Sequence, residues 1–281
     1  MTVQGIISRV ADYIPLRVKV ALRGDRGSPN RLASIVHSLL NRLPAERYPV
    51  LLCGGALKGY RMRVDWQIHR SFVYGSWEPE VVRSIQSHVK RGMRVLDIGA
   101  QSGFYSLLLS RLIGPEGLVF AFEPLPANYR ILEENVSLNH ISNVVVIREA
   151  VSDQSGEISF EFPHEEASLV AGPILEGDNL GRFQVPSISL DDFAHQTGHH
   201  VHFIKMDVEG AETAVLRGAV QTLRTFHPPM IVELHYDSSQ QGQHPAISFL
   251  QELGYQIEWL NEVDYRSHIF AQWIPSSTES R

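Results

Sequence analysis

The stretch from residue 93 to residue 112 limits the fold of this chain more than any other. Residues 93–98 are apolar apart from Arg94 and Asp97, which is typical of a strand covered on both faces. Glycines follow at positions 99 and 103, and the apolar segment after them predicts a helix. A buried strand, a glycine turn and a helix in this order are typical of an α/β protein that binds a ligand in the turn, because the helix directs free N–H groups toward it.

The residues of the turn narrow the choice of ligand. A dinucleotide-binding turn reads G-x-G-x-x-G, and Gln101 replaces its second glycine, so the turn does not fit an NAD-linked oxidoreductase. The pattern Asp97-x-Gly99-x-x-x-Gly103 resembles motif I of class I S-adenosylmethionine (SAM) methyltransferases. A turn with a purely structural role is the alternative.

The next apolar segment, residues 118–122, predicts a second buried strand that ends at Glu123, 20 positions after Gly103. A carboxylate at the end of this strand can accept hydrogen bonds from both ribose hydroxyls of a nucleotide. The alternative for Glu123 is an acidic residue before Pro124 at the start of a helix. The spacing favours the ribose role.

A third strand is expected at residues 143–147, and the strand-end loop after it is where the adenine of a nucleotide would lie. The backbone groups of Ala150 and Val151 and the carboxylate of Asp153 are candidates for contacts with the adenine edge. The alternative for Asp153 is a turn residue before Gly156.

A second group of ionisable residues follows the fourth and fifth predicted strands. The fourth strand ends at Asp207, at the sheet edge where ligands of open α/β sheets bind. Glu209 and Glu212 then begin a helix to about residue 225, where acidic residues suit the helix dipole. The fifth strand, residues 228–235, carries Glu233 and His235 on the same side, because side chains alternate along a strand.

These residues predict a catalytic centre. His235 can accept a proton near neutral pH and is our candidate for a general base, with Asp207 orienting it or the acceptor and Glu209 beside them. A structural histidine is the alternative for His235. The alternative is that Asp207, Glu209 and Glu233 hold Mg²⁺, which prefers carboxylate ligands and would assist the reaction.

Length and composition limit the function classes. The 281 residues, 43% of them hydrophobic, can bury the core of one α/β domain with an extension. A net charge of −6 opposes broad nucleic-acid binding. The single cysteine excludes an intrachain disulfide, and a reducing cytoplasm is the expected compartment. No apolar run reaches about 18 residues, and charges interrupt the N-terminus, so we expect neither a transmembrane segment nor a signal peptide.

We expect three regions in the chain. Residues 1–70 form an N-terminal extension of two short helices and a β-hairpin at 49–66, residues 71–275 form the main domain, and residues 276–281 form a frayed tail. The basic extension is interpreted as a lid or an arm for a homo-oligomer. Peripheral contact with a membrane surface or an acidic partner is the alternative.

Other segments of the main domain carry weaker signals. Ser76 can cap a helix that begins at Pro79, and residues 163–184 predict a variable loop over the site. Strands at 255–260 and 268–273 are expected to form an antiparallel edge. No metal ligand is assigned to the histidine group, because its members are spaced too closely to converge on one ion; they are His195, His199, His200 and His202.

Six motifs in order resemble the FkbM family of SAM-dependent methyltransferases, and the similarity extends over residues 72–260. The block Lys-x-Asp-x-Glu-Gly-x-Glu at 205–212 is the most specific of them. Gln101 and Met206 stand where the family more often has Asn and Ile, and neither departure removes a charge or a glycine. The motifs are Phe72–Pro79, Asp97–Ser106, Phe120–Pro124, Ser189–Phe193, Ile204–Glu212 and Val232–His235.

The resemblance implies a Rossmann-like seven-stranded α/β sheet, mostly parallel with an antiparallel C-terminal strand. It also implies SAM-dependent methylation, usually of a hydroxyl on a sugar, a glycoconjugate or a natural-product intermediate. By position, residues 99–103 face the methionine part of SAM, Glu123 the ribose, residues 150–153 the adenine, and Asp207 the sulfonium and the acceptor. The expected cofactor contacts are Asp97, Gly99, Ala100, Gln101, Ser102, Gly103, Phe104, Glu123, Pro124, Ala150, Val151, Asp153 and Asp207. A non-catalytic nucleotide-binding or scaffold protein on the same fold is the alternative, because a fold does not fix a function.

Overall fold

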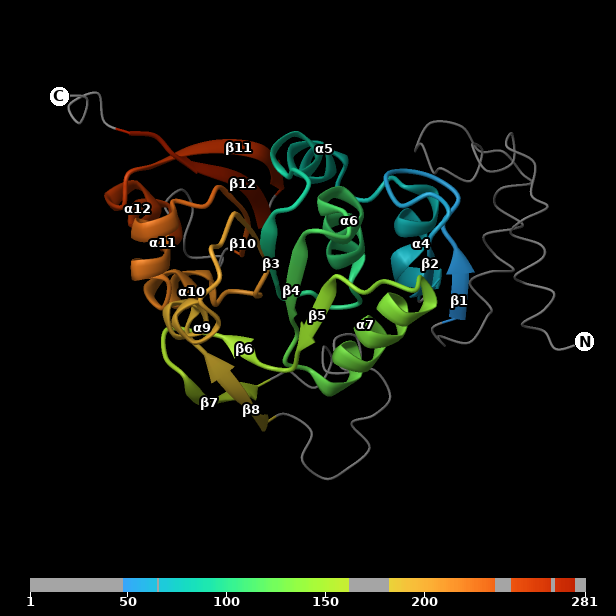
Figure 1. Ribbon diagram of the computed structural model, residues 1–281, viewed down its shortest axis with the longest axis horizontal. Coiled ribbons are helices and arrows are strands. Elements are labelled where there is room, and N and C mark those ends of the chain that lie inside the picture. Colours follow the sequence, from blue (N-terminus) through green and yellow to red (C-terminus); the bar gives the residue numbers. More distant parts are fainter. Residues whose placement is uncertain (1–47, 65, 162–181, 236–243, 264–265, 276–281) are drawn as a thin grey trace, which may run out of the picture.

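Seven strands form a central sheet, seen in the middle of Figure 1. Their spatial order is β11 (Tyr255–Val263), β12 (Arg266–Trp273), β10 (Met230–His235), β9 (Phe203–Met206), β3 (Arg94–Ile98), β4 (Leu118–Phe122) and β5 (Val144–Ile147). The strands β5, β4, β3, β9 and β10 are parallel, and β12 is antiparallel to both β10 and β11. The predicted seven-stranded sheet with an antiparallel C-terminal strand is confirmed, and that last strand lies between β10 and β11.

The computed structural model describes residues 48–64, 66–161, 182–235, 244–263 and 266–275. The two helices expected near the N-terminus lie outside these residues. So do most of the loop expected at 163–184 and the tail 276–281.

Helices cover both faces of the central sheet, because its strands are apolar on both sides. On the first face, strand residues such as Val95 and Ile231 pack with α5 (Pro79–His88), α6 (Phe104–Ile113) and α7 (Pro126–Leu138). On the second face, residues such as Leu96 and Val232 pack with α9 (Leu190–Thr197), α10 (Glu212–Arg217), α11 (Val220–Phe226) and α12 (Pro245–Glu252). The alternation of strand side chains therefore divides the core into two layers.

The predicted N-terminal hairpin is present as β1 (Tyr48–Leu51) and β2 (Arg61–Val64), which pair antiparallel. Val50 and Met62 of the hairpin belong to the first layer of the core, together with residues of α4 (Trp66–Tyr74). Asn135 of α7 accepts a hydrogen bond from the backbone N–H of Arg63 at 2.6 Å. The hairpin thus packs on the same layer as α5 and α6, and the domain boundary expected at residue 70 stays a prediction.

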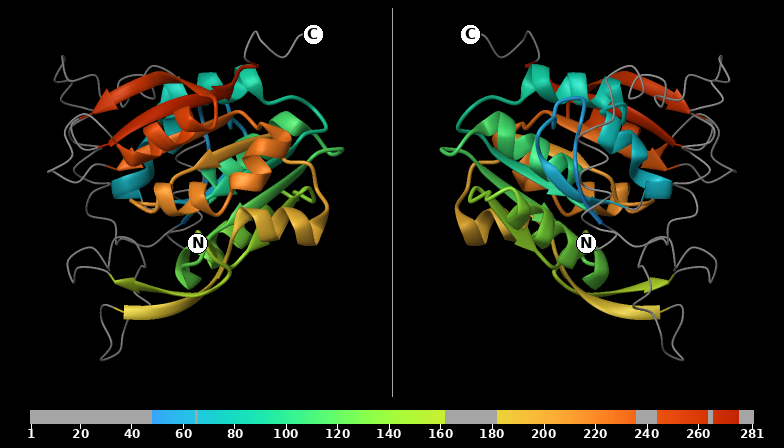
Figure 2. Two further views of the ribbon diagram at one scale, coloured as in Figure 1. Left: turned by 90° about the vertical axis from the view of Figure 1, so that its left-hand side faces the viewer. Right: turned by 90° about the vertical axis from the view of Figure 1, so that its right-hand side faces the viewer.

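A small second sheet forms from a segment expected to be an exposed strand, 157–162, and from segments expected to be loops. The strand β6 (Ala150–Val151) pairs parallel with β8 (Arg182–Ile188), and β8 pairs antiparallel with β7 (Gly156–Glu161). Figure 2 shows β7 and β8 as a ribbon extending along the lower side of the molecule. The prediction of a loop at 150–151 is wrong because pairing with a distant strand fixes these residues. The described end of the loop expected to reach residue 184 belongs to β8.

Two helix starts or ends differ from those predicted. The helix expected from Glu209 to residue 225 begins only at Glu212, because Glu209 has a positive φ of 50°. It is also two helices, α10 and α11, which separate at Gly218. A Cβ on Gly218 would lie 2.1 Å from the carbonyl oxygen of Ser152, so the break lets another segment approach the backbone here. The helix expected to have Ser76 as its cap has Glu78 there instead, without a side-chain cap bond. The Glu78 carboxylate is therefore available to other partners.

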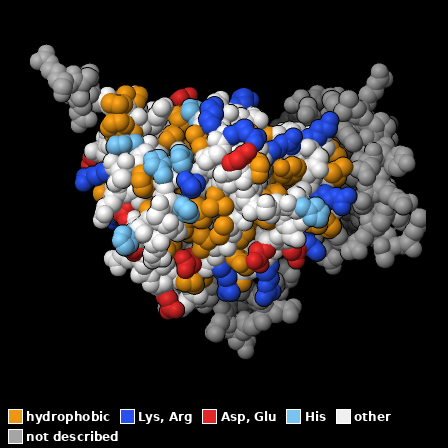
Figure 3. All heavy atoms as spheres, viewed as in Figure 1, with side chains coloured by type: hydrophobic (Ala, Val, Ile, Leu, Met, Phe, Trp, Pro, Cys, Tyr) orange, Lys and Arg blue, Asp and Glu red, His pale blue; other side chains and the backbone are white. Residues whose placement is uncertain are grey.

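Basic and acidic side chains are interspersed with hydrophobic ones on the face of the molecule drawn in Figure 3.

Within the described residues, no helix combines the length and the apolarity that a membrane crossing requires.

Replacing Gly99 by alanine tests how closely β3 and β9 meet at their carboxyl ends. Gly99 has a φ of +77°, and a Cβ on it would lie 1.7 Å from the carbonyl oxygen of Asp207. Gly92 has the same φ of +77°, but its Cβ would meet nothing within 4 Å, so G92A carries the backbone cost alone. We expect urea unfolding to show a loss of about 3 kcal/mol or more for G99A and of about 1–2 kcal/mol for G92A. Equal losses in the two variants would contradict the close approach.

Candidate functional site

The glycine turn after β3 meets the residue that follows β9. The backbone N–H of Asp207 donates to the carbonyl of Ile98 at 2.9 Å, which extends the pairing of β3 and β9 to the turn. Gly99 then passes so close to the Asp207 carbonyl that no side chain fits between them. Asp207 therefore lies beside the turn, at the carboxyl ends of the parallel strands, as predicted.

Glu123 is bonded to the same turn from the end of β4. Its Oε2 accepts a hydrogen bond from the N–H of Gln101 at 2.8 Å, and its Oε1 accepts one from the N–H of Leu125 at 3.0 Å. Glu123 is only 4% exposed. Burial raises the pKa of this carboxyl to about 7, although the two backbone hydrogen bonds act in the opposite direction. Glu123 and Asp207 thus border one turn.

The turn offers its backbone to a ligand more than its side chains. Gln101 is the exposed residue and has a φ of 50°. Gly103 has a φ of 89° at the start of α6, a conformation that residues with a side chain rarely adopt. A Cβ there would also lie 2.4 Å from Cδ1 of Leu132 in α7, which would have to shift. Three expected contact residues have buried side chains, which are Ala100, Ser102 and Phe104.

A row of ionisable side chains continues from the turn along the first face of the sheet. Asp97 lies beside Lys205 in the register of β3 and β9, and Glu233 lies opposite His268 in the register of β10 and β12. Because side chains alternate, Asp207 and His235 lie on this same face. The first face thus changes from apolar to charged at the carboxyl ends of its strands. The row consists of Asp97, Lys205, Asp207, Glu233, His235 and His268.

Lys205 is the buried cation of this row, and it was not among the predicted site residues. Its side chain is 2% exposed, and its Nζ lies 3.2 Å from Oδ2 of Asp207. The ammonium group also lies 4.7 Å from the ring centroid of Tyr105. Burial lowers the pKa of Lys205, but the charges of Asp207 and Asp97 outweigh it and raise the pKa above its usual value. A lone lysine within an apolar strand is the sequence signal that could have found it.

Asp97 supports this cation from inside the sheet. It is fully buried, and its Oδ2 accepts a hydrogen bond from the hydroxyl of Ser106 at 2.5 Å. Burial raises the pKa of Asp97, and the charge of Lys205 opposes the shift. Asp97 is therefore a buried charge that Lys205 compensates. Direct contact between Asp97 and a cofactor stays a prediction.

His235 stands among the acidic residues that the sequence predicts beside it. Its Nε2 lies 3.2 Å from Oε2 of Glu209 and 3.9 Å from Oδ1 of Asp207. Its Nδ1 lies 2.8 Å from Oε1 of Glu212, whose side chain is fully buried. Glu212 therefore orients the imidazole, a role that sequence reasoning missed because only the packing of α10 against β10 creates the contact.

The acidic surroundings control the protonation of His235. Burial lowers its pKa, but the hydrogen bond to Glu212 and the charges of Glu209 and Asp207 outweigh burial and raise the pKa to about 9. These surroundings therefore favour the protonated form of His235 at neutral pH. A cation bound beside Asp207 would repel this proton and favour the neutral imidazole.

The residues expected near adenine lie beyond the end of β5. The N–H of Glu123 donates to the carbonyl of Ile147 at 3.0 Å, which brings the end of β4 beside this segment. Ala150 and Val151 are buried in β6, so they would offer backbone groups, whereas Asp153 is exposed. Their contact with adenine, like that of Pro124, stays a prediction.

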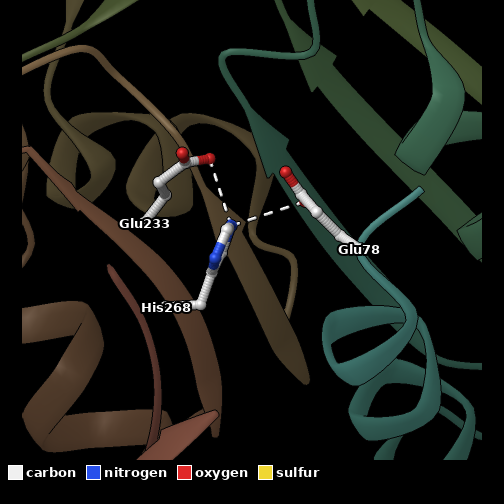
Figure 4. A group of neighbouring side chains, drawn as sticks. All are labelled: Glu78, Glu233 and His268. Atoms are coloured by element: carbon white, nitrogen blue, oxygen red, sulfur yellow. Dashed lines mark hydrogen bonds and ion pairs between the residues drawn. The ribbon is translucent and has the colours of Figure 1, made fainter. Parts of the chain in front are cut away.

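A second cluster, Glu78, Glu233 and His268, was not predicted as a site (Figure 4). Nε2 of His268 lies 3.1 Å from Oε2 of Glu233 and 3.4 Å from Oε2 of Glu78. Burial lowers the pKa of His268, but the bonds to both carboxylates outweigh it and raise the pKa to about 9. Three distant segments meet here, and no local pattern in the sequence reveals the contact.

The histidines at 195–202 are not part of either group of potential metal ligands that the described residues form. Those groups, whose ligand atoms lie within 4.8 Å of one another, are Glu78–Glu233–His268 and Asp207–Glu233–His235. Nδ1 of His202 instead accepts a hydrogen bond from the N–H of Arg94, at the amino end of β3. This is the edge of the sheet opposite the candidate site.

Comparison with known proteins gives one family match for more than half of the chain. The family described as the Methyltransferase FkbM domain matches residues 97–257. This range contains the glycine turn, Glu123, Asp207 and His235.

Relatives and solved structures are similar over parts of their own length. The chain is 29% identical over 160 residues to the hexuronic acid methyltransferase AglP of Haloferax volcanii, which is 56% of this chain and 62% of that protein. It is 28% identical over 144 residues to the 2-O-methyltransferase NoeI of Sinorhizobium fredii, 46% of this chain and 58% of that protein. The structure of a methyltransferase FkbM from Methylobacillus flagellatus has a TM-score of 0.47 at 17% identity, over 86% of this chain and 59% of that chain. The chain thus spans about three fifths of the two relatives.

Replacing Lys205 by methionine should destabilise the chain, because Asp97 and Asp207 lose their buried cation. We expect K205M to lower the free energy of unfolding at pH 7 by about 3–5 kcal/mol, measured by urea denaturation. K90M removes an exposed lysine and should cost less than about 1 kcal/mol. Adding D97N to K205M should recover part of the loss, because it removes one uncompensated charge. A K205M protein as stable as the wild type would show that the cation is not required.

Proposed function

Because the chain belongs to the FkbM methyltransferase family, we propose that it transfers the methyl group of SAM to a hydroxyl group of a sugar, a glycoconjugate or a natural-product intermediate. The observation that carries this proposal is the meeting of Glu123 and Asp207 at the glycine turn. Each acid follows a parallel strand, and this edge is where open α/β sheets bind ligands.

Each part of SAM would have a partner of suitable chemistry at this edge. The methionine part would lie on the backbone of residues 99–103, at the start of α6, whose first N–H groups have no acceptor within the helix and would favour its carboxylate. The ribose hydroxyls would donate to the Glu123 carboxylate. The positive sulfonium would lie beside Asp207, whose side chain is 27% exposed. The adenine would lie near Asp153.

The acceptor hydroxyl must be aligned with the sulfonium methyl group and must lose one proton. In the transfer, a bond forms between the acceptor oxygen and the methyl carbon as the bond from sulfur to that carbon breaks. His235 would take the hydroxyl proton at Nε2, while Glu212 holds Nδ1. Alignment of this kind contributes several kcal/mol, and a positioned base adds about 10²–10⁴-fold in rate.

The names of two relatives support a carbohydrate acceptor. NoeI is a 2-O-methyltransferase, and AglP acts on a hexuronic acid. Sugars of this class present several hydroxyl groups, which matches a site that combines a proton acceptor with carboxylates able to bind hydroxyls. The acceptor itself can be found by mass spectrometry of a metabolite extract incubated with the chain and methyl-labelled SAM, as a product heavier by one labelled methyl group.

Isothermal titration tests the cofactor. We expect binding of SAM and S-adenosylhomocysteine but not of NAD. E123Q should weaken SAM binding by about 10–100-fold, because the amide cannot accept from both ribose hydroxyls. E133Q, at an exposed position of α7, is the matched control and should bind SAM like the wild type. Preference for NAD, or unchanged SAM affinity in E123Q, would refute the proposed cofactor site.

Substitution of His235 tests the proton acceptor. Once the labelled product is identified, H235A should lower kcat by about 10²–10⁴-fold and leave the Kd for SAM near that of the wild type. H140A replaces an exposed histidine and should leave kcat unchanged. If H235A loses SAM binding together with activity, His235 has a structural role.

A further inference from the structure

The cluster of Glu78, Glu233 and His268 has no assigned role in methyl transfer, although Oε1 of Glu233 lies 3.8 Å from Nε2 of His235. Glu78 precedes α5, Glu233 lies in β10, and His268 lies opposite it in β12. Figure 4 shows the three side chains directed toward one another from these separate elements. The side chains of Glu78, Glu233 and His268 are 10%, 4% and 3% exposed. Two buried carboxylates and one imidazole nitrogen thus converge on one point.

The two distances from His268 to the carboxylates fall in the range expected between ligands of one metal ion, and all three ligand atoms lie within 4.8 Å of one another. Nε2 of His268 lies 3.1 Å from Oε2 of Glu233 and 3.4 Å from Oε2 of Glu78. Bonds of about 2.1 Å from one ion to nitrogen and oxygen ligands place neighbouring ligand atoms roughly 3.0–3.4 Å apart at right-angled to tetrahedral geometry. The imidazole nitrogen is therefore spaced from both carboxylates as a fellow ligand of one ion would be.

The hydrogen bonds of Asn261 show which ring nitrogen of His268 carries a proton. Its Oδ1 accepts a hydrogen bond from the backbone N–H of His268 at 3.0 Å, which identifies this atom as the amide oxygen. The same Oδ1 lies 3.0 Å from Nδ1 of His268, so Nδ1 must be the donor. Nε2 therefore faces the two carboxylates and must carry either a second proton or a metal ion.

Both carboxylates have outer partners, but at different oxygens. The hydroxyl of Tyr105 donates to Oε2 of Glu78, the oxygen that faces His268. The guanidinium of Arg266 lies 3.4 Å from Oε1 of Glu233, which leaves Oε2 directed at His268. Metal-binding histidines donate their other N–H to an oxygen, and their carboxylate neighbours are hydrogen-bonded in turn. All three side chains have such a partner.

We propose that Glu78, Glu233 and His268 bind a divalent transition-metal ion, of the class of Mn²⁺ or Zn²⁺, in place of the second ring proton of His268. Two carboxylates balance the charge of the ion, and the imidazole ligand favours these ions over Mg²⁺, which prefers oxygen alone. The bound ion joins the start of α5 to β10 and β12. The proposal is independent of methyl transfer.

Cobalt provides a direct readout of this site. The full chain is treated with a chelator and titrated with Co²⁺, followed by visible absorption and by the unfolding temperature, and the freshly purified chain is analysed for bound metals by mass spectrometry. We expect one Co²⁺ per chain with a ligand-field band, and a higher unfolding temperature at saturation. E78Q and H268Q should lose this binding. H235Q should keep it, because the other group of potential ligands shares Glu233 with this site but needs His235.

A milder variant keeps the test valid if H268Q does not fold. N261A retains all three ligands but removes the acceptor for Nδ1, and it should weaken Co²⁺ binding by about 10–100-fold. No Co²⁺ binding by the wild type, or binding that persists in E78Q and H268Q, overturns the proposal and leaves an imidazolium between two carboxylates. SAM titration of the same samples separates this result from a failure of the proposed function.

Discussion

The ammonium group of Lys205 is the charge on which the carboxyl edge of the sheet depends. The edge brings Asp97, Asp207 and Glu233 together on a face that is otherwise part of the hydrophobic core. Carboxylates removed from water stay ionised only where a cation compensates them. Lys205 lies against Asp207 and lowers its pKa, although burial acts in the opposite direction. Asp207 therefore presents a negative charge to a ligand while most of its surroundings remain buried.

The glycines of the turn have separate tasks, although the motif presents them as a pair. Gly99 lets the end of β3 lie against the backbone of Asp207, and Gly103 adopts the left-handed conformation with which the chain enters α6. One glycine thus places an acid beside the turn, and the other sets the start of the helix. Glu123 completes the arrangement by accepting the N–H of Gln101. The backbone of the turn thus lies between two acids, and this arrangement suits a nucleoside with a positive charge.

Local sequence patterns predicted the parts of the fold that local forces determine. The apolar strands, the hairpin and the helices after the glycine turn and Glu123 are present, because hydrophobic periodicity and turn residues set them. The residues at strand ends were predicted as a site because parallel strands share a carboxyl edge. Contacts between distant segments could not be predicted: β6 pairs with β8, Gly218 breaks a helix against Ser152, and Glu212 reaches His235. Lys205 was also missed, but it differs from these contacts because a lysine within an apolar strand is a signal that the sequence itself contains.

The most direct test of the site is a crystal structure of the chain with S-adenosylhomocysteine. The ribose hydroxyls should lie within hydrogen-bonding distance of Glu123, and the sulfur should lie beside Asp207 with Nε2 of His235 on the side that the methyl group would occupy. Binding at another edge of the sheet, or a ribose that does not contact Glu123, would contradict the proposed site.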